Sequence, residues 1–193
     1  MKSVKDKFSN QAKIYKKYRP TCPIEIYQEI IQHVKSKDSC WDCGTGNGQV
    51  AINLTKYFKT IYATDISQNQ LDNAVQHENI IYKVERAERT NFLDNQFDLI
   101  TIAQAIHWFD FEAFNKEVRR VSKNEGIISI WGYGLLRINP KIDQLINIFY
   151  HEIIGPYWNK ERKHKTNEKS ARTKTKNTRT ERAIKKKQKY QKR

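Results

Sequence analysis

The chain has few cysteines and no long apolar run, and both absences limit what it can be. Its 193 residues include only three cysteines, Cys22, Cys40 and Cys43. No stretch reaches the roughly 20 apolar residues of a membrane-spanning helix, and no signal-peptide pattern opens the sequence. We therefore expect a soluble, cytoplasmic protein of a reducing compartment, with no membrane partner and no disulfide staples.

Metal ligands at the usual spacing are also lacking. Cys40 and Cys43 form one Cys-x-x-Cys pair, but there is no second such pair and no suitably spaced histidine pair, so no metal site is expected. A redox motif is the alternative, because such a pair can also follow a strand. Cys40 falls within an apolar strand, and Asp42 between the thiols disfavours a thiolate, so both cysteines are interpreted as packing residues.

Positive charge is concentrated at the C-terminal end. The formal net charge is +15, yet residues 160–193 hold 16 Lys and Arg against 3 Asp and Glu, a net charge of +13. Residues 1–159 hold 20 against 18, or +2, and the 38% of hydrophobic residues in the chain are enough for one core. The basic character therefore belongs to the tail.

A stretch with alternating glycines organises the rest of the chain. The apolar strand that ends in residues 40–43 is followed by Gly44, Gly46 and Gly48, and a helix is predicted from Val50. These glycines permit positive φ and leave room for a ligand against main-chain N–H groups. A dinucleotide fingerprint needs its third glycine one place later, at Gln49, so this spacing suits a nucleoside without phosphates, as in S-adenosylmethionine (SAM) sites.

Residues 60–65 predict a second strand that closes on a carboxylate. Asp65 stands 17 positions after Gly48 and can accept two hydrogen bonds from a ribose diol. The glycines alone fit an ordinary tight turn equally well. The order of strand, glycine loop, helix, strand and carboxylate favours the nucleoside site.

Alternating strands and helices predict an α/β fold: a doubly wound, mostly parallel sheet with helices on both faces. Further strands are expected at 80–84, 97–103 and 127–131, the last with the apolar pattern of a strand buried on both faces and paired on both sides. Without later strands beside it, one edge of this strand would stay unpaired and its apolar side chains poorly covered. Helices are expected at 8–19, 23–35, 50–58, 67–76 and 111–123. Ile24, Tyr27, Ile31 and Val34 would form the apolar stripe of the second helix, and Ser67 with Gln70 a capping box for the fourth.

In such a sheet the ligand lies beyond the carboxyl ends of the strands. The residues expected at that edge are the glycine loop, Asp65, Ala87, Glu88 and the stretch 104–108. Asp98 stands at the opposite end of its strand and is expected to be a strand-start residue.

Six segments within residues 8–164 carry a family resemblance. They are FSNQAKIYKKYRPTCP, DCGTGNGQ, ATDIS, RAERTNF, FDLITIAQAIHWFD and GPYWNKERKH. In this order they resemble class I SAM-dependent methyltransferases, in particular the small-molecule branch that includes trans-aconitate methyltransferase. The resemblance implies a Rossmann-like fold, SAM as cofactor and a small, acidic methyl acceptor.

The resemblance also implies roles for single residues. The methionine part of SAM would lie beside Asp42 and the glycine loop, the ribose beside Asp65, the adenine beside Ala87 and Glu88, and the sulfonium beside Gln104. The implied cofactor-binding residues are Asp42, Gly44, Gly46, Gly48, Asp65, Ile66, Ala87, Glu88 and Gln104. The implied substrate residues are Tyr15, Tyr18 and Arg19, on a helix that closes over the site, and Trp108. Arg86 departs from the small or polar residue of relatives and puts a charge near the adenine pocket.

His107 is the candidate general base. Methyl transfer from a sulfonium needs placement above all, and a carboxylate acceptor is already a nucleophile. A base is needed only for an acceptor that must lose a proton. A positioning or packing role beside Trp108 is the favoured alternative for this histidine.

The tail after His164 departs from the family. It has almost no apolar residues and no period, so it is expected to be disordered, and the last two strands of the family's sheet are expected to be missing. One reading is a natural basic arm for nucleic acid or nuclear import. The other, which we favour, is a shifted reading frame or truncated gene model. Tyr190 is the only aromatic residue of the tail, which counts against base stacking.

These observations predict three parts: N-terminal helices at 1–36 that cover the site, a SAM-binding methyltransferase core at 37–159, and a basic tail at 160–193. The leading hypothesis is methyl transfer to a small carboxylate acceptor. One alternative is an inactive SAM-fold remnant whose tail binds RNA or DNA, and another is an RNA methyltransferase that captures its substrate with the tail. The sequence gives no oligomeric state.

Overall fold

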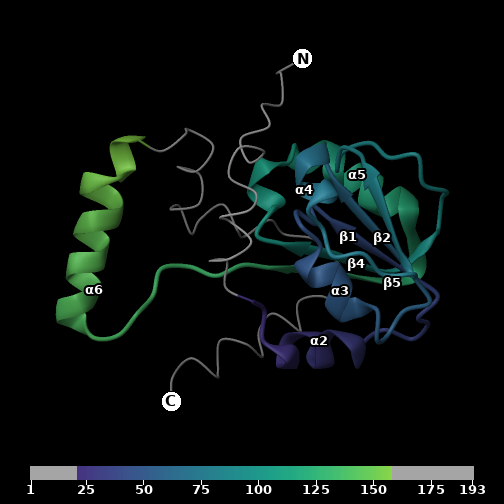
Figure 1. The fold of residues 1–193 in the computed structure, drawn as a ribbon, viewed down its shortest axis with the longest axis horizontal. Helices are drawn as coiled ribbons and strands as arrows, with labels where there is room; N and C mark the ends of the chain where they lie inside the picture. Colours follow the sequence, from purple (N-terminus) through teal and green to yellow (C-terminus); the bar gives the residue numbers. More distant parts are fainter. Residues whose placement is uncertain (1–20, 158–193) are drawn as a thin grey trace. The chain divides into compact units, whose positions relative to one another are not determined.

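A computed structural model describes residues 21–157, and these contain one parallel sheet (Figure 1). Its five strands lie in the order β3-β2-β1-β4-β5, and each neighbouring pair is parallel. The strands are β1 Ser39–Cys43, β2 Thr60–Asp65, β3 Ile80–Val84, β4 Phe97–Ala103 and β5 Ser122–Trp131. The chain winds outward from β1 to β3 and then returns to the other side of β1. The doubly wound α/β prediction is confirmed, and the strand order reverses between β1 and β4.

Strand positions agree with the sequence prediction except at β5. The predicted bounds of β2, β3 and β4 are those observed. Strand β5 begins at Ser122 instead of residue 127, and its pairing with β4 is irregular between Phe97 and Leu99. A Cβ on Gly126 would lie 2.8 Å from the Phe97 carbonyl oxygen, so only glycine fits this close approach of the two strands.

Strand β5 is poorly covered, as expected for this strand without later strands beside it. Its residues are half-buried or exposed, and Ile130 is 46% exposed. Within residues 21–157 this strand pairs with β4 alone, so it is an edge strand. The apolar run that suggested a central strand therefore lies at the border of the described sheet.

The helices occur where predicted but end earlier. They are α2 Ile24–Ile31, α3 Gln49–Leu54, α4 Gln68–Asp72 and α5 Phe111–Val121, with a 3₁₀ turn η2 at Ile106–Trp108. The predicted ends at residues 35, 58, 76 and 123 are wrong. Tight i to i−3 hydrogen bonds replace the helical pattern after α2 and α3, from Val34 N to Ile31 O and from Tyr57 N to Leu54 O. The Ser67 half of the predicted capping box of α4 is confirmed, since the Ser67 hydroxyl accepts a hydrogen bond from Gln70 N. Ser67 N donates to the Asp65 carboxylate.

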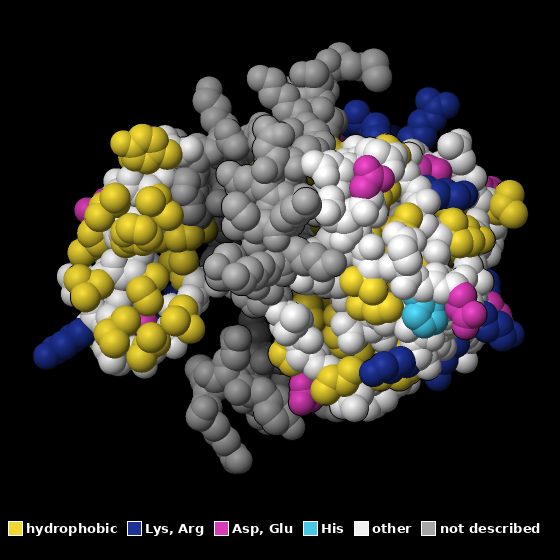
Figure 2. Space-filling view, in the orientation of Figure 1, with side chains coloured by type: hydrophobic (Ala, Val, Ile, Leu, Met, Phe, Trp, Pro, Cys, Tyr) yellow, Lys and Arg dark blue, Asp and Glu magenta, His cyan; other side chains and the backbone are white. Residues whose placement is uncertain are grey.

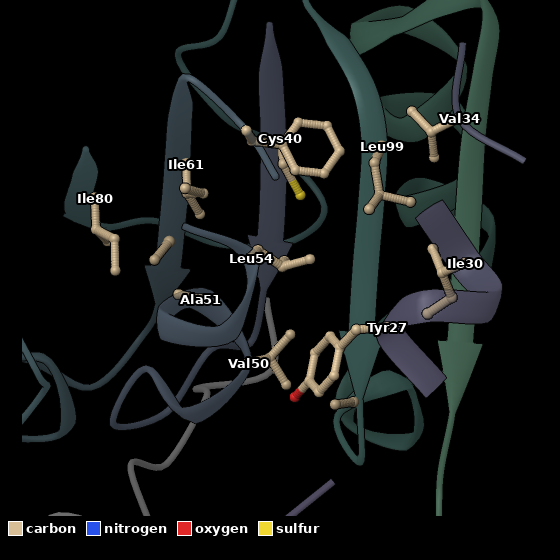
Figure 3. Packing of buried hydrophobic residues seen from close by; sticks show 13 residues of the cluster. Tyr27, Ile30, Val34, Cys40, Val50, Ala51, Leu54, Ile61, Ile80 and Leu99 are labelled. Atoms are coloured by element: carbon tan, nitrogen blue, oxygen red, sulfur yellow. The ribbon is translucent and has the colours of Figure 1, made fainter. Parts of the chain in front are cut away.

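Helices α2 and α3 cover one face of the sheet (Figure 3). Cys40, Ile61 and Leu99 point from β1, β2 and β4 toward Ala51 and Leu54 of α3 and toward the side chains of α2. The predicted stripe of α2 is right for Tyr27 and Val34 and wrong for Ile24, which is 39% exposed while Ile30 is buried.

Helix α5 covers the other face. Trp41 and Ile100 pack there against Phe114 and Val118, together with Phe97 from the start of β4. Trp41 lies 5.9 Å from the Phe97 ring and 6.3 Å from the Phe114 ring, measured between centroids. Successive residues of β1 therefore enter two different cores, as the period of a strand requires.

Asp98 has the structural role that was expected of it. Its carboxylate accepts hydrogen bonds from the main-chain N–H groups of Asp38 and Ser39, each at 3.0 Å. Lys123 donates to the other carboxylate oxygen at 2.8 Å. This buried acid joins the starts of β1, β4 and β5, at the end of the sheet away from the glycine loop.

The chain divides into two compact units, Met1–Ile146 and Asn147–Arg193. Helix α6 spans Pro140–Asn147, and the second unit continues with a π-helical segment η3 at Ile148–Ile153 and a 3₁₀ turn η4 at Gly155–Tyr157. Hydrophobic side chains gather on the surface of this segment, among them Leu145, Phe149 and Ile153 (Figure 2). No helix within residues 21–157 is long and apolar enough to cross a bilayer. The predicted helix at 8–19 and the tail at 160–193 lie outside the described residues.

Candidate functional site

The glycine loop joins β1 to α3 in a left-handed backbone conformation. The φ angles of Gly44, Gly46 and Gly48 are 68°, 58° and 80°. Residues with a side chain rarely adopt such angles. A Cβ on Gly44 would also lie 2.6 Å from the Ala105 side chain, and one on Gly48 would clash with the Tyr82 hydroxyl. Backbone conformation therefore favours glycine at all three positions, and close neighbours add a steric reason at Gly44 and Gly48.

Asp65 ties the end of β2 to this loop. Its Oδ2 accepts a hydrogen bond from Gly46 N at 2.9 Å, and its Oδ1 accepts one from Ser67 N at 3.0 Å. The side chain remains partly exposed. A carboxylate has about four lone-pair sites, so these two bonds leave acceptor capacity for a ligand diol. The sequence prediction placed Asp65 at this edge, and it did not anticipate that the residue also shapes the loop.

Asp42 is a second carboxylate at the same edge, and it is buried. It is 1% exposed, and its two oxygens accept hydrogen bonds from the hydroxyls of Thr45 and Thr101 at 2.5 and 2.8 Å. Thr101 comes from β4, so Asp42 bridges the two strands between which the strand order reverses. These two hydroxyl donors stabilise the ionised carboxylate inside the protein.

The charges around the loop disfavour a phosphate. Burial is the main cause that raises the pKa of the Cys43 thiol well above its usual range, and the carboxylates of Asp42, Asp65 and Glu88 add to it. The negative charge of all three acids is therefore felt at Cys43, next to the glycine loop. The N–H groups of Thr45, Gly46 and Gly48 are bonded to Thr64 O, Asp65 and Thr45 O, and so do not form an open anion cradle. A ligand that carries a cation and a sugar diol fits these acceptors, and SAM has both.

Asn47 is an unusual member of the loop. It is 1% exposed, and neither its side-chain oxygen nor its nitrogen has a hydrogen-bond partner among the described residues. A buried amide without partners is costly. It is consistent with a loop whose polar contacts are completed by a ligand or an ordered water.

A pocket opens at the carboxyl ends of β1, β4 and β5. Figure 3 shows the arrowheads of the central strands pointing to this edge, where Val50 and the Tyr27 hydroxyl lie. Asp42, Gly44 and Gln104, three of the predicted residues, line the same pocket. The full lining is Cys22, Asp42, Gly44, Thr45, Gln49, Val50, Ala103, Gln104, Trp131 and Tyr133.

The residues predicted at the adenine end follow β3. Ala87 is buried, and the Glu88 carboxylate accepts a hydrogen bond from Asp110 N at 2.9 Å. Arg86, whose charge was expected near this pocket, lies 3.4 Å from Glu88 in an ion pair. Glu88 therefore holds the N-terminal end of α5 beside the glycine loop. Ile66, also predicted to bind cofactor, is 42% exposed.

His107 and Trp108 lie together in η2, just after β4. Their ring centroids are 4.7 Å apart, and both side chains are half-buried. Neither belongs to the lining of the pocket. The predicted substrate residues Tyr15, Tyr18 and Arg19 lie outside the described residues.

The interpretation of the cysteine pair as packing residues is confirmed. Cys40 and Cys43 are both fully buried and unpaired, and they enter the cores on opposite faces of the sheet. Burial raises the pKa of each thiol well above its usual range. A redox pair needs an accessible thiolate, and neither residue supplies one.

Trp131 and Tyr133 were missed by the sequence analysis. They line the pocket from the end of β5, and Trp131 Nε1 lies 3.1 Å from the Cys22 sulfur. The rule that ligands lie beyond the carboxyl ends of parallel strands, applied also to the fifth strand, would have included them. Thr45 and Thr101, which hold Asp42, carried no comparable signal, because threonine is common in loops and strands.

Comparisons with known proteins agree with this geometry. Residues 41–130 match the family model described as a methyltransferase domain. A Dictyostelium discoideum protein named for an inferred methyltransferase activity is 39% identical over 163 residues, which cover 82% of this chain and 62% of that protein. A Saccharomyces cerevisiae protein named as a probable SAM-dependent methyltransferase is 24% identical over 162 residues, covering 75% of this chain and 54% of its own length. The chain thus spans about six-tenths of these relatives' length or less.

Solved structures show the same relationship. The structure of an Anaeromyxobacter dehalogenans protein, assigned as a type II methyltransferase, matches with a TM-score of 0.67 and 31% identity. The match covers 76% of this chain and 63% of that one. The structure of a Methanococcus maripaludis protein, assigned as a SAM-dependent methyltransferase, matches in fold with a TM-score of 0.63 and 24% identity. The match covers 89% of this chain and 84% of that one. In sequence and in fold, residues 41–130 are therefore similar to the methyltransferase domains of these proteins.

Proposed function

We propose that this chain transfers the methyl group of SAM to a small, acidic molecule. The observation that carries the proposal is the pair of carboxylates, Asp42 and Asp65, on either side of a left-handed glycine loop at the point where strand order reverses. The family supports SAM as cofactor. The acidic acceptor rests on the sequence resemblance and on the chemistry below.

Each described residue has a stated role in the proposed complex. Asp65 accepts hydrogen bonds from the ribose diol while it holds Gly46. Asp42 provides negative charge for the cationic end of the cofactor, and Gln104 lines the same pocket. Ala87, Glu88 and Ile66 border the adenine. When bound, SAM supplies a methyl carbon on a sulfonium, which is already activated toward displacement.

The arrangement of residues favours an acceptor that is itself a nucleophile. The pocket lining is dominated by apolar and amide groups, and His107 stands outside it in η2. A carboxylate acceptor needs no base, so alignment of the two reactants supplies the acceleration, up to roughly 7–11 kcal/mol. His107 then acts through packing on Trp108 instead of as a general base.

The test compares S-adenosylhomocysteine binding by wild type and by Asp65→Asn in titration calorimetry. Asparagine removes the charge and keeps one oxygen for one of the two main-chain donors, while its NH2 group faces the other donor; alanine would release both Gly46 N and Ser67 N. We expect affinity to fall about tenfold to a hundredfold, since charge-assisted hydrogen bonds contribute about 1.5–3 kcal/mol.

Asp72→Asn is the matched control, because Asp72 is an exposed carboxylate of the neighbouring helix α4. It should bind S-adenosylhomocysteine as wild type does. Equal affinities for wild type and Asp65→Asn would remove Asp65 from the site. No binding by wild type would refute the proposed function.

A further inference from the structure

Gln104 has a backbone conformation that is rare for a residue with a side chain. Its φ is 58°, and within residues 21–157 the only other non-glycine residue with positive φ is Asn95. Such outliers are held in place by their surroundings and are frequent at binding sites. Gln104 directly follows β4 and lines the pocket beside Asp42.

Two contacts hold this residue against the end of β5. Gln104 N donates to the Trp131 carbonyl at 3.0 Å, and its side-chain Nε2 donates to the Tyr133 carbonyl at 3.2 Å. The main chain and the side chain of Gln104 therefore bond to the residues on either side of Gly132. The side chain extends the contact between β4 and β5 beyond the last ladder pair, Ala103 with Trp131.

A side chain on Gly132 would crowd the carboxamide of Gln104. A Cβ built on it would lie 3.1 Å from Nε2, 3.3 Å from Cδ and 3.4 Å from Oε1 of Gln104, so all three atoms of the amide face the same point. The backbone of Gly132 does not have positive φ, so the reason for glycine here is space. A Cβ built on Gly134, two residues later, would have no neighbouring atom within 4 Å.

We propose that Gly132 is a positioning residue: by lacking a side chain, it sets the orientation of the Gln104 carboxamide in the cofactor pocket. This inference rests on the proposed function, since it assigns the amide to the SAM site. A Cβ at position 132 would shift the amide by a few tenths of an ångström, which weakens its 3.2 Å bond to Tyr133 O and changes the direction in which Gln104 presents its polar atoms to the ligand.

The experiment measures S-adenosylhomocysteine binding by calorimetry for Gly132→Ala, with Gly134→Ala as the matched control. Both changes add one methyl group at an ordinary φ, so their effects on the unfolded chain are alike. We expect Gly132→Ala to bind about tenfold more weakly, as for the loss of one hydrogen bond, and Gly134→Ala to bind as wild type does. Thermal unfolding of the two variants should differ little.

A double-mutant cycle with Gln104→Ala shows whether Gly132 acts through the amide. Alanine keeps the Cβ and the strained backbone of Gln104 and removes only the carboxamide. Gln104→Ala and the double variant should then have equal affinity, because no amide remains to displace. Wild-type affinity in Gly132→Ala, or a further tenfold loss in the double variant, would overturn the inference. If wild type itself does not bind, the proposed function fails first.

Discussion

Asp65 combines a structural role with the proposed ligand-binding role in one carboxylate. Its two oxygens hold Gly46 N and Ser67 N, so it fixes both the glycine loop and the turn before α4. A substitution that removes the whole side chain therefore changes the loop as well as the proposed ribose contact. The conservative Asp65→Asn variant separates these two roles better than alanine does.

The cysteines offer a prediction at the scale of single residues. Cys40 and Cys43 are fully buried with raised pKa values, whereas Cys22 is partly exposed at the pocket. Because the thiolate is the reactive species, iodoacetamide at pH 8 should modify Cys22 in the native protein and leave the other two intact. Peptide mass spectrometry gives the sites.

All three cysteines should react in urea, which is the control for reagent access. Rapid native alkylation of Cys43, or a disulfide between Cys40 and Cys43 after mild oxidation, would restore the redox interpretation of the pair.

The loop after β3 is fastened to α5 by a buried ion network. Glu117 Oε1 accepts hydrogen bonds from Thr90 N at 2.8 Å and from Arg120 Nη2 at 2.7 Å. Arg120 Nη1 in turn donates to the carbonyl of Phe92 at 2.7 Å. The same loop carries Ala87 and Glu88, so α5 positions the proposed adenine end of the site.

This network predicts a pH-dependent contribution to stability. Burial acts to raise the pKa of Glu117, but hydrogen bonds from Arg120 and Thr90 outweigh it, so the pKa is lowered from 4.5. A carboxyl group whose pKa is lower in the folded state stabilises the fold at pH values above its pKa in the unfolded state. This contribution is lost as the pH falls through the pKa of the folded state. Glu117→Gln should reduce the free energy of unfolding at pH 7 by about 1–3 kcal/mol, and the difference from wild type should shrink below pH 4.5.

Urea unfolding of wild type and Glu117→Gln between pH 3 and pH 7 measures this effect. Glu112→Gln is the control, because Glu112 is an exposed acid one turn earlier on α5. A difference between wild type and Glu117→Gln that is constant with pH would show that the carboxylate's ionisation contributes nothing.

At the scale of the whole molecule, the concentration of positive charge in the tail predicts non-specific binding of RNA. Residues 160–193 carry a net charge of +13, and those after residue 164 can be removed without touching the described residues. Deletion of residues 165–193 should abolish salt-sensitive retention of the protein on an RNA column, because released counterions drive such binding. S-adenosylhomocysteine affinity should not change.

Methylation assays on RNA decide between the alternatives for the tail. We expect no difference between full chain and deletion variant in this assay. A loss of RNA methylation that accompanies the loss of retention would favour an RNA methyltransferase over the small-molecule enzyme proposed here.

The sequence by itself determined the strands, the glycine loop and the capped start of α4. Strands β2, β3 and β4 are short apolar runs with clear boundaries, so local pattern is enough to define them. The glycine spacing is equally local, because each φ angle depends on one residue and its neighbours. Family resemblance then gave the cofactor, and the methyltransferase assignment is supported by the comparisons.

Only the tertiary structure decided the helix ends, the irregular start of β5 and the second use of Asp65. The irregular pairing of β5 near Gly126 involves a close approach to Phe97, a residue almost thirty positions away. The pocket wall at Trp131 and Tyr133, and the contact of Gly132 with Gln104, arise where β4 and β5 end side by side. Contacts between residues far apart in sequence leave no local pattern, so no reading of single segments could have found them.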